Sequence, residues 1–398
     1  MRRPGLKPAG VVLMTALVGT LAIAATAYGR PAASSGGKAV VAADRAAVSC
    51  GSARIGIMGP FTGNAASIGQ EQLKWARYSL STFNRQNRTN YKLREADTQL
   101  VASQAATRAT QLAADRNVVV VVGPAGSQEV QAVARTFRGM AYISPSATNT
   151  SLTIGKARIP TFYRVVGNDA SQSVTDARFI RDRLNGRRVW IIDDQTSYSV
   201  PLANGVQANL RAAGATVTRE SVNQSQADFS SLVTRISADT QVVFLPWQLA
   251  NRAATFYNQM REQGKRATIL GSDGLDSGDF IGVANGSYFS AFAPDIRLSR
   301  NAAIRRIIAG YTRQYGAKAF QSNFGPPAYL ATQAAYVALK AACRDGQVSR
   351  AEILRTLPKT NILNSILGGG LKFNKNHDPA AARFYLFRVV NGKAQFVS

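Results

Sequence analysis

The chain has 398 residues and a formal net charge of +26, because 48 Lys and Arg residues stand against 22 Asp and Glu residues. Its one histidine, His377, and its two cysteines, Cys50 and Cys343, are too few for a zinc or iron site and argue against a Ser-His-Asp or Cys-His catalytic site. Two cysteines in a chain of this length exclude a disulfide-dense scaffold, while the charge raises nucleic acid or anionic membranes as partners.

The N-terminus has the pattern of a secretory signal peptide. Basic residues precede an apolar run over residues 11–24, and Ala25-Thr26-Ala27 then supplies a cleavage site of the A-x-A type. We therefore predict that residues 1–27 are a signal peptide and that the protein is exported, to the periplasm or to the cell surface. A transmembrane anchor is the alternative reading of this segment.

Residues 28–52 are rich in alanine, glycine and serine and show no periodicity, which predicts a flexible tether. Cys50 ends a lipobox-like stretch but lies too far beyond the apolar run for a lipid anchor to be favoured. In an oxidising compartment Cys50 and Cys343 can form a disulfide, and two isolated thiols are the alternative.

From residue 53 onward, short apolar strands alternate with amphipathic helices. The five valines of Val118–Val122 indicate a strand buried on both faces, and Ile55–Met58 is a second apolar strand. The other elements expected in this first copy are strands at Tyr91–Glu95 and Ala141–Ser144 and helices at Gln70–Arg85, Ser103–Asp115 and Gln128–Phe137. A break without regular pattern follows at residues 145–160.

The same pattern starts again near Arg188. The expected strands are Val189–Ile192, Thr216–Val222, Gln241–Leu245 and Thr268–Leu270, and the expected helices are Leu202–Ala213, Asp228–Ser237 and Leu249–Gln263. Two long helices, Asn301–Tyr315 and Pro327–Cys343, and a final strand, Phe384–Val390, complete the chain. This alternation predicts an α/β protein with two doubly wound, parallel-sheet lobes.

In open parallel sheets, ligands bind beyond the carboxyl ends of the strands. The loop at residues 59–69 is rich in glycine but lacks the Gly-Lys-Ser/Thr of a phosphate loop, so it gives no support for a nucleotide site. The loop at residues 123–127 opens into a helix at Ser127, where backbone N–H groups and a hydroxyl favour an anion. A plain helix cap at Ser127 is the alternative.

Loops of the second copy carry aromatic and acidic residues, whereas loops of the first copy carry hydroxyls and amides. This division suits a zwitterion, with its carboxylate on Ser127 and Thr148 and its ammonium on Asp273. Tyr198 and Trp247 would then contact its side chain. Simpler roles stay open, namely a core position for Trp247, a surface ring for Tyr198 and a turn cap for Asp273.

Three short motifs of this sequence resemble those of a known protein family. They are Gly59-Pro-Phe-Thr-Gly63, the segment Ile143–Asn149 and Gly271-Ser-Asp-Gly274. Together with the export signal they resemble the leucine/isoleucine/valine-binding family of ABC-transporter solute receptors, over about residues 53–390. The resemblance implies the fold of a type I periplasmic binding protein, with two lobes joined by three hinge crossings. It also implies lobe bounds, with residues 53–166 and 294–370 in lobe 1 and residues 167–293 and 371–398 in lobe 2.

The resemblance also implies a site, residue by residue. Its members are Ser127, Ser146 and Thr148 for the α-carboxylate, Asp273 for the ammonium, and Tyr198, Trp247 and Ile68 around the ligand side chain. The sequence departs from the family in three ways: Asp273 stands where the branched-chain receptors have Glu, Ile68 replaces a ring, and residues 97–99 lack the cysteine of a small disulfide. The side-chain pocket is therefore expected to differ.

The expected function is binding without chemistry, so no enzyme activity, cofactor or metal is predicted. The implied partners are an amino acid or related solute and the permease and ATPase subunits of an ABC importer, with the receptor itself a monomer. A sensory receptor of the same fold and a cationic surface-binding protein are the alternatives. Nucleic acid is not expected, because the basic residues are scattered and no basic stretch interleaves with aromatic residues.

Overall fold

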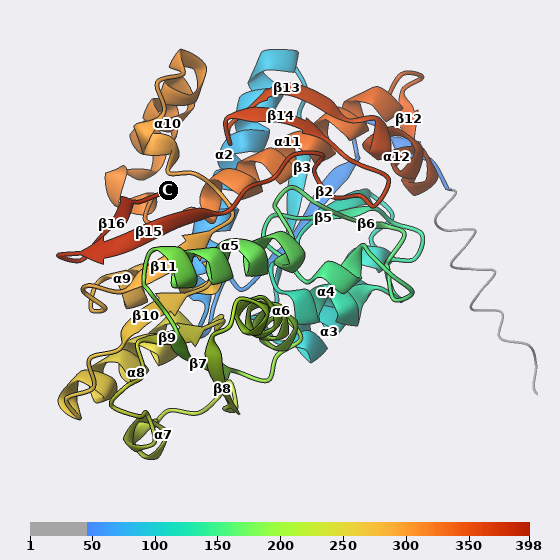
Figure 1. Cartoon of the computed structure of the whole chain (residues 1–398). Coiled ribbons are helices and arrows are strands. Elements are labelled where there is room, and N and C mark those ends of the chain that lie inside the picture. Colours follow the sequence, from blue (N-terminus) through green and yellow to red (C-terminus); the bar gives the residue numbers. More distant parts are fainter. Residues whose placement is uncertain (1–45) are drawn as a thin grey trace, which may run out of the picture.

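The computed structural model describes residues 46–398, which form two α/β lobes that are each built on a separate sheet (Figure 1). The predicted signal peptide, and residues 28–45 of the predicted tether, lie outside the described residues. None of the helices within residues 46–398 has both the length and the apolar character needed to cross a membrane.

The sheet of lobe 1 has five strands in the order β3-β2-β4-β5-β6, and all neighbouring pairs are parallel. The strands are β2 (Arg54–Gly59), β3 (Lys92–Asp97), β4 (Val118–Val122), β5 (Tyr142–Ser144) and β6 (Phe162–Arg164). All five valines of β4 are buried, as expected for a central strand that is covered on both faces.

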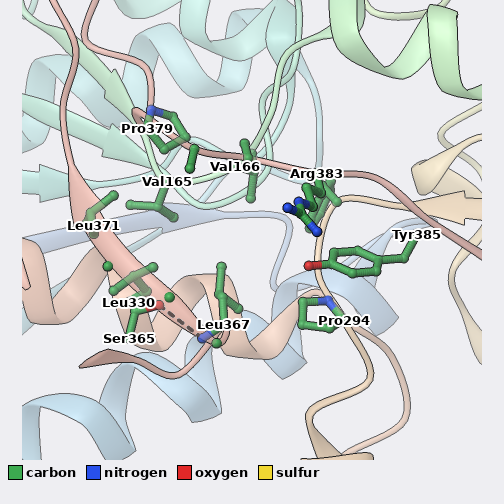
Figure 2. A pocket seen from close by; sticks show the side chains of 16 residues that line it. Val165, Val166, Pro294, Leu330, Ser365, Leu367, Leu371, Pro379, Arg383 and Tyr385 are labelled. Carbon is green, nitrogen blue, oxygen red and sulfur yellow. Dashed lines mark hydrogen bonds between the residues drawn. The ribbon is translucent and has the colours of Figure 1, made fainter. Parts of the chain in front are cut away.

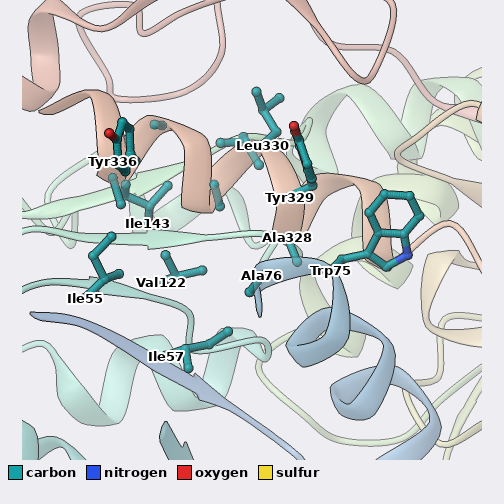
Figure 3. Close-up of a cluster of buried hydrophobic side chains, with 14 of the residues drawn as sticks. Ile55, Ile57, Trp75, Ala76, Val122, Ile143, Ala328, Tyr329, Leu330 and Tyr336 are labelled. Atoms are coloured by element: carbon teal, nitrogen blue, oxygen red, sulfur yellow. The ribbon is translucent and has the colours of Figure 1, made fainter. Parts of the chain in front are cut away.

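Six helices belong with this sheet. They are α2 (Ala66–Asn87), α3 (Ala102–Ala114), α4 (Ser127–Val133), α10 (Ala302–Tyr315), α11 (Gly325–Ala342) and α12 (Arg350–Thr356). Tyr329 and Tyr336 of α11 join residues of β2 and β4 in one hydrophobic cluster (Figure 3). The helices α2 and α11 approach closely because Gly325 has no side chain, and a Cβ there would lie 1.9 Å from the Trp75 indole.

The sheet of lobe 2 has seven strands in the order β16-β15-β11-β10-β9-β7-β8. The strands are β7 (Arg188–Asp193), β8 (Thr216–Ser221), β9 (Val242–Leu245), β10 (Thr268–Gly271), β11 (Tyr288–Ala291), β15 (Tyr385–Val390) and β16 (Lys393–Phe396). The strands β7 to β11 are parallel to one another, and β15 and β16 extend the sheet in antiparallel pairing. Its helices are α5 (Asp169–Asp182), α6 (Ser199–Ala212), α7 (Ser230–Thr234), α8 (Ala250–Glu262) and α9 (Gly278–Ile281).

The helix α5 fills a stretch for which the sequence pattern gave no element. Its start is marked by Asn168, whose side chain accepts hydrogen bonds from the backbone N–H groups of Ala170 and Ser171. The helix escapes an analysis of apolar spacing because its buried face includes Asp169, Gln172 and Asp176. The strands β6 and β11 were also not expected, and α7 is shorter than the helix expected at Asp228–Ser237.

The chain passes between the two sheets three times. The first passage follows β6, the second follows β11, and the third follows the hairpin of β13 (Asn361–Ser365) and β14 (Gly369–Lys372). Each lobe is therefore assembled from segments that are far apart in the sequence.

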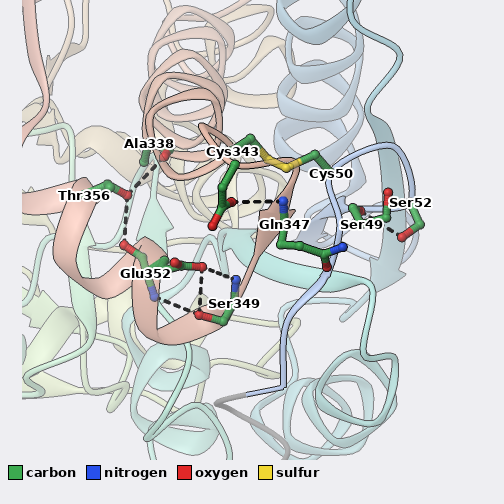
Figure 4. The surroundings of a disulfide bond; sticks show 10 residues. Ser49, Cys50, Ser52, Ala338, Cys343, Gln347, Ser349, Glu352 and Thr356 are labelled. Atoms are coloured by element: carbon green, nitrogen blue, oxygen red, sulfur yellow. Dashed lines mark hydrogen bonds between the residues drawn. A yellow bond between two sulfur atoms is a disulfide. The ribbon is translucent and has the colours of Figure 1, made fainter.

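A disulfide joins Cys50 to Cys343 across a sequence separation of 293 residues (Figure 4). Beside it, β1 (Val48–Ser49) pairs in antiparallel fashion with β12 (Gln347–Val348). The beginning of the described chain is thus fastened to the segment that follows α11 in lobe 1.

Candidate ligand-binding site

The polar residues expected to form a site come from loops that follow strands of both sheets. Ser127 begins α4 and Thr148 follows β5, while Tyr198 precedes α6 and Asp273 begins a short 3-10 helix, η2 (Asp273–Leu275). These four residues, and Ser146 with them, are each no more than 6% exposed. They are linked through Asn149, whose side-chain amide donates a hydrogen bond to the Ser197 carbonyl of lobe 2.

The loop that follows β5 is held by hydrogen bonds within lobe 1. The Ser146 hydroxyl donates to the Ala125 carbonyl at 2.9 Å and accepts from the Gln72 amide at 2.9 Å. Ser127 Oγ accepts from the Asn149 N–H at 3.2 Å. The hydroxyl of Ser146 is therefore already used within the protein.

A buried arginine, Arg164, donates hydrogen bonds to the backbone of the same loop. Arg164 Nε lies 2.6 Å from Asp378 Oδ1, in an ion pair whose arginine side chain is 0% exposed. Its Nη1 donates to the carbonyls of Ala147 at 3.0 Å and Asn149 at 2.9 Å, and its Nη2 donates to the Thr153 hydroxyl. The loop that carries Ser146 and Thr148 is thus fixed before any ligand arrives.

In lobe 2, Asp273 is the centre of a buried hydrogen-bond network. Its Oδ1 accepts from the Tyr198 hydroxyl at 2.7 Å and from Gln172 Nε2 at 2.6 Å. Burial raises the pKa of Asp273 to about 6, although both hydrogen bonds lower it. The next residue, Gly274, allows η2 to lie against the loop after β9, because a Cβ there would be 2.2 Å from the Trp247 carbonyl oxygen.

Two further carboxyl groups on α5 lie near Asp273, and the sequence analysis missed both. Asp169 and Asp176 are buried, and each is close enough to Asp273 for the two charges to repel. Burial raises the pKa of Asp169 to about 7 and raises the pKa of Asp176 well above its usual value. The Asn168 cap, followed by polar residues at positions 169, 172 and 176 on one helical face, is the sequence signal that could have revealed them.

The residues expected to surround the ligand side chain have three different outcomes. Tyr198 is buried against Asp273 and acts there as a hydrogen-bond donor. Trp247 is instead a core residue: its indole N–H donates to the Ile192 carbonyl at 2.7 Å, and its ring packs on Phe229 and Phe256. Ile68 packs in the hydrophobic core of lobe 1, next to the interlobe contact made by Ser67.

The two lobes touch each other through hydrogen bonds of polar side chains. Ser67 Oγ lies 3.1 Å from Ser277 Oγ, and Gln128 Nε2 donates to Gln248 Oε1 at 2.9 Å. A third contact runs from the Asn323 N–H of lobe 1 to Asp276 Oδ2 at 2.8 Å.

The third contact brings two carboxyl groups toward each other across the lobe interface. Glu71 of α2 accepts hydrogen bonds from the loop at residues 321–322, and Asp276 accepts from Asn323 in the same loop. Burial raises the pKa of Glu71 to about 8, with a further contribution from the charge of Asp276, and burial raises the pKa of Asp276 to about 7. Burial at this point of the interface therefore disfavours the charged form of both carboxyl groups.

A separate cavity of about 310 Å³ lies where the three passages between the lobes meet (Figure 2). Val165 and Val166 come from the first passage, Pro294 from the second, and Pro379 and Tyr385 from the third. The predicted ligand-binding residues do not line it.

Residues 52–394 match the sequence profile of the periplasmic binding protein family. The chain belongs to that family. Its members are binding proteins, and the fold of two parallel-sheet lobes joined by three passages is confirmed as that of a type I periplasmic binding protein. Within residues 46–398, no group of three or more His, Cys, Asp or Glu side chains is placed to hold a metal ion.

An amino acid binding protein of Pseudomonas aeruginosa is 26% identical over 322 residues, which are 78% of this chain and 84% of that protein. The leucine binding protein LivK of Thermotoga maritima superposes with a TM-score of 0.77 at 22% identity, covering 87% of this chain and 98% of the other. The branched-chain amino acid transporter substrate-binding protein LivJ of Streptococcus pneumoniae, solved with isoleucine, gives 0.75 at 23% identity, with 87% and 99% covered. The structural similarities support the shared fold.

Proposed function

We propose that this protein is the extracytoplasmic solute receptor of an ABC importer and that it binds an α-amino acid, or a closely related zwitterion, between its lobes. Family membership gives the general role, and relatives named for amino acids and branched-chain amino acids support the class of solute. The observation that carries the proposal is the buried Asp273, held by Tyr198 and Gln172. The hydrogen bond from Asn149 to the Ser197 carbonyl joins the lobe 1 loop that carries Thr148 to the residue before Tyr198.

Each site residue then has a role set by its hydrogen bonding. Asp273 pairs with the ligand ammonium, and Tyr198 keeps that carboxylate oriented. The ligand carboxylate lies against Ser127 and Thr148, whose hydroxyls are both buried in loops of lobe 1. Ser146 fixes the loop through its own bonds to Ala125 and Gln72 rather than through the ligand.

The motion proposed for transport is a rotation about the three passages. We assign residues 53–166 and 294–370 to lobe 1 and residues 167–293 and 371–398 to lobe 2. The open receptor captures solute on the loops of lobe 1, and rotation brings Tyr198 and Asp273 over it. The closed form then docks on the membrane permease, whose ATPase subunits are separate chains.

The receptor is proposed to act as a monomer outside the cytoplasmic membrane, in the periplasm or at the cell surface. Export by the signal peptide at residues 1–27, followed by a flexible tether, is part of the same proposal, although β1 and the Cys50–Cys343 disulfide fasten the end of the predicted tether, which spans residues 28–52, to lobe 1. Size-exclusion chromatography with light scattering on the exported protein tests the oligomeric state, and N-terminal sequencing tests the cleavage after Ala27.

A thermal-shift screen of amino acids and small amides on the exported protein tests the proposed solute class. A ligand at about 100 times its Kd adds about 2.7 kcal/mol of stability. A shift with α-amino acids that is absent with the matching amines and carboxylic acids is the expected result. If no amino acid shifts the transition, the assignment to α-amino acids is wrong.

A further inference from the structure

Helix α5 presents a row of polar side chains to the interior of the protein. Asp169, Gln172 and Asp176 are spaced so that they share one helical face, and each is at most 3% exposed. Gln172 Nε2 donates to Asp273 Oδ1 at 2.6 Å and to Ser290 Oγ at 3.0 Å. The row therefore runs into the Asp273 network rather than forming a separate surface feature.

Hydrogen-bond acceptors outnumber donors in this row. Both carboxyl oxygens of Asp169, both of Asp176 and Gln172 Oε1 are buried, and two hydroxyls, that of Thr148 beside Asp169 and that of Ser290 beside Asp176, are the side-chain donors next to these five acceptors. A buried polar group that lacks a partner costs about 1–3 kcal/mol, so the row favours a ligand that brings several N–H donors.

The charges of the row also favour a ligand with cationic N–H donors. Asp169, Asp176 and Asp273 are close enough to repel one another, and the nearby Arg164 attracts Asp169. Arg164 does not balance the three carboxyl groups, because its own partner is Asp378 and its remaining donors bind the loop of lobe 1. The three carboxyl groups are also not arranged to hold a metal ion.

We propose that the ligand carries a second cationic nitrogen group, which lies against Asp169 and Asp176 while Asp273 holds the α-ammonium. The ligand class is then a basic α-amino acid, with a guanidinium or an ammonium in its side chain. A guanidinium suits the row best because its five N–H donors match the buried acceptors. This inference rests on the proposed function and narrows it.

Calorimetric titration of the exported protein with L-arginine, L-citrulline and L-leucine tests the inference. Citrulline has nearly the shape of arginine but carries a neutral urea group. We expect arginine to bind at least about tenfold more tightly than citrulline, which corresponds to about 1.4 kcal/mol. Citrulline binding as tightly as arginine, or leucine binding while arginine does not, overturns the inference and leaves the proposed function standing. Failure of every amino acid to bind overturns the proposed function itself.

Substitution of Asp176 tests the place of the second cation. In the variant Asp176→Asn we expect the preference for arginine over citrulline to fall at least fivefold, with little change in the affinity for citrulline. Asp182→Asn, on the exposed end of the same helix, is the matched control and should leave the preference unchanged. Asp169→Asn gives a second variant if Asp176→Asn does not fold. An unchanged preference in the folded variant means that Asp176 is a structural carboxyl group and overturns its assignment.

Discussion

The two lobes present opposite kinds of polar surface to the site. In lobe 1 the loop after β5 is internally paired, since the Ser146 hydroxyl is used and Arg164 binds two of the loop carbonyls. In lobe 2 each buried carboxyl group of α5 has one hydroxyl beside it, Thr148 for Asp169 and Ser290 for Asp176, whereas Asp273 is held by two neighbouring side chains. The loop of lobe 1 is thus already hydrogen-bonded within the protein, whereas the carboxyl groups of lobe 2 can accept further hydrogen bonds from a ligand.

This difference suggests a division of labour during capture. A fixed platform lowers the entropy that must be lost when a ligand first binds, because its loop is already ordered. Buried carboxyl groups with too few donors make closure without a ligand unfavourable, because part of the cost of their desolvation is not compensated. A cationic ligand removes that penalty, so closure is tied to the presence of the right solute.

The largest expected effect comes from removing the centre of the lobe 2 network. Asp273→Ala should weaken amino acid binding by about 3–5 kcal/mol, because the ligand ammonium would be buried without its partner. Calorimetry with the best ligand of the thermal-shift screen measures the loss. Asp279→Ala, a nearby exposed position, is the control. Unchanged affinity in Asp273→Ala would show that this carboxyl group does not contact the ammonium.

Removing the support of the lobe 1 platform should cost folding stability. Arg164→Met leaves Asp378 buried without its cationic partner, with the Asn168 amide still donating to it, and we expect the free energy of unfolding to fall by about 3–5 kcal/mol. Urea denaturation followed by circular dichroism measures the change. The exposed Arg158→Met provides the comparison. A loss below about 1 kcal/mol would mean that the loop does not depend on this ion pair.

A pH titration of binding probes the lobe 2 carboxyl group directly. The pKa of Asp273 is raised to about 6, so the group must lose a proton before it can pair with an ammonium. Affinity is then fully present above that pKa and is lost as the pH falls through it. Calorimetry should give a Kd about tenfold weaker at pH 5 than at pH 8. A Kd that is constant over this range contradicts the role of Asp273.

The smallest expected effect concerns the contacts that join the two surfaces. Ser67→Ala removes a hydroxyl pair with Ser277 and should weaken binding by about 0.5–1.5 kcal/mol, since one hydrogen bond of the closed form is lost. Calorimetry is compared with the exposed Ser103→Ala. Equal losses in both variants would place the Ser67 contact outside the closure step.

Sequence patterns predicted the two parallel-sheet lobes because the central strands of both sheets are continuous apolar segments. A continuous apolar run of this kind predicts a central strand without knowledge of its neighbours, and it does so for β4, β7 and β9. The loop after β4 then places Ser127, and the loop after β10 places Asp273, at the expected edges of the sheets. Gly274 marks the close approach that orients η2.

The parts that the sequence could not supply depend on distant partners. Arg164 and Asp378 are 214 residues apart, and no local pattern joins them. The helix α5 lacks an apolar stripe, so the sequence did not predict the helix or the burial of its acidic face against β11. Tyr198 and Trp247 both follow strands of lobe 2, yet the first meets Asp273 and the second fills the core. Only three-dimensional packing separates these two outcomes.

The disulfide gives the molecule a property that its fold alone does not. Cys50 and Cys343 close a covalent ring that contains all of lobe 2 except its last two strands, as well as most of lobe 1. A protease that cuts one loop inside the ring leaves a single molecule whose two pieces cannot drift apart. In an oxidising environment outside the cell membrane, a nicked protein can therefore keep its lobes together.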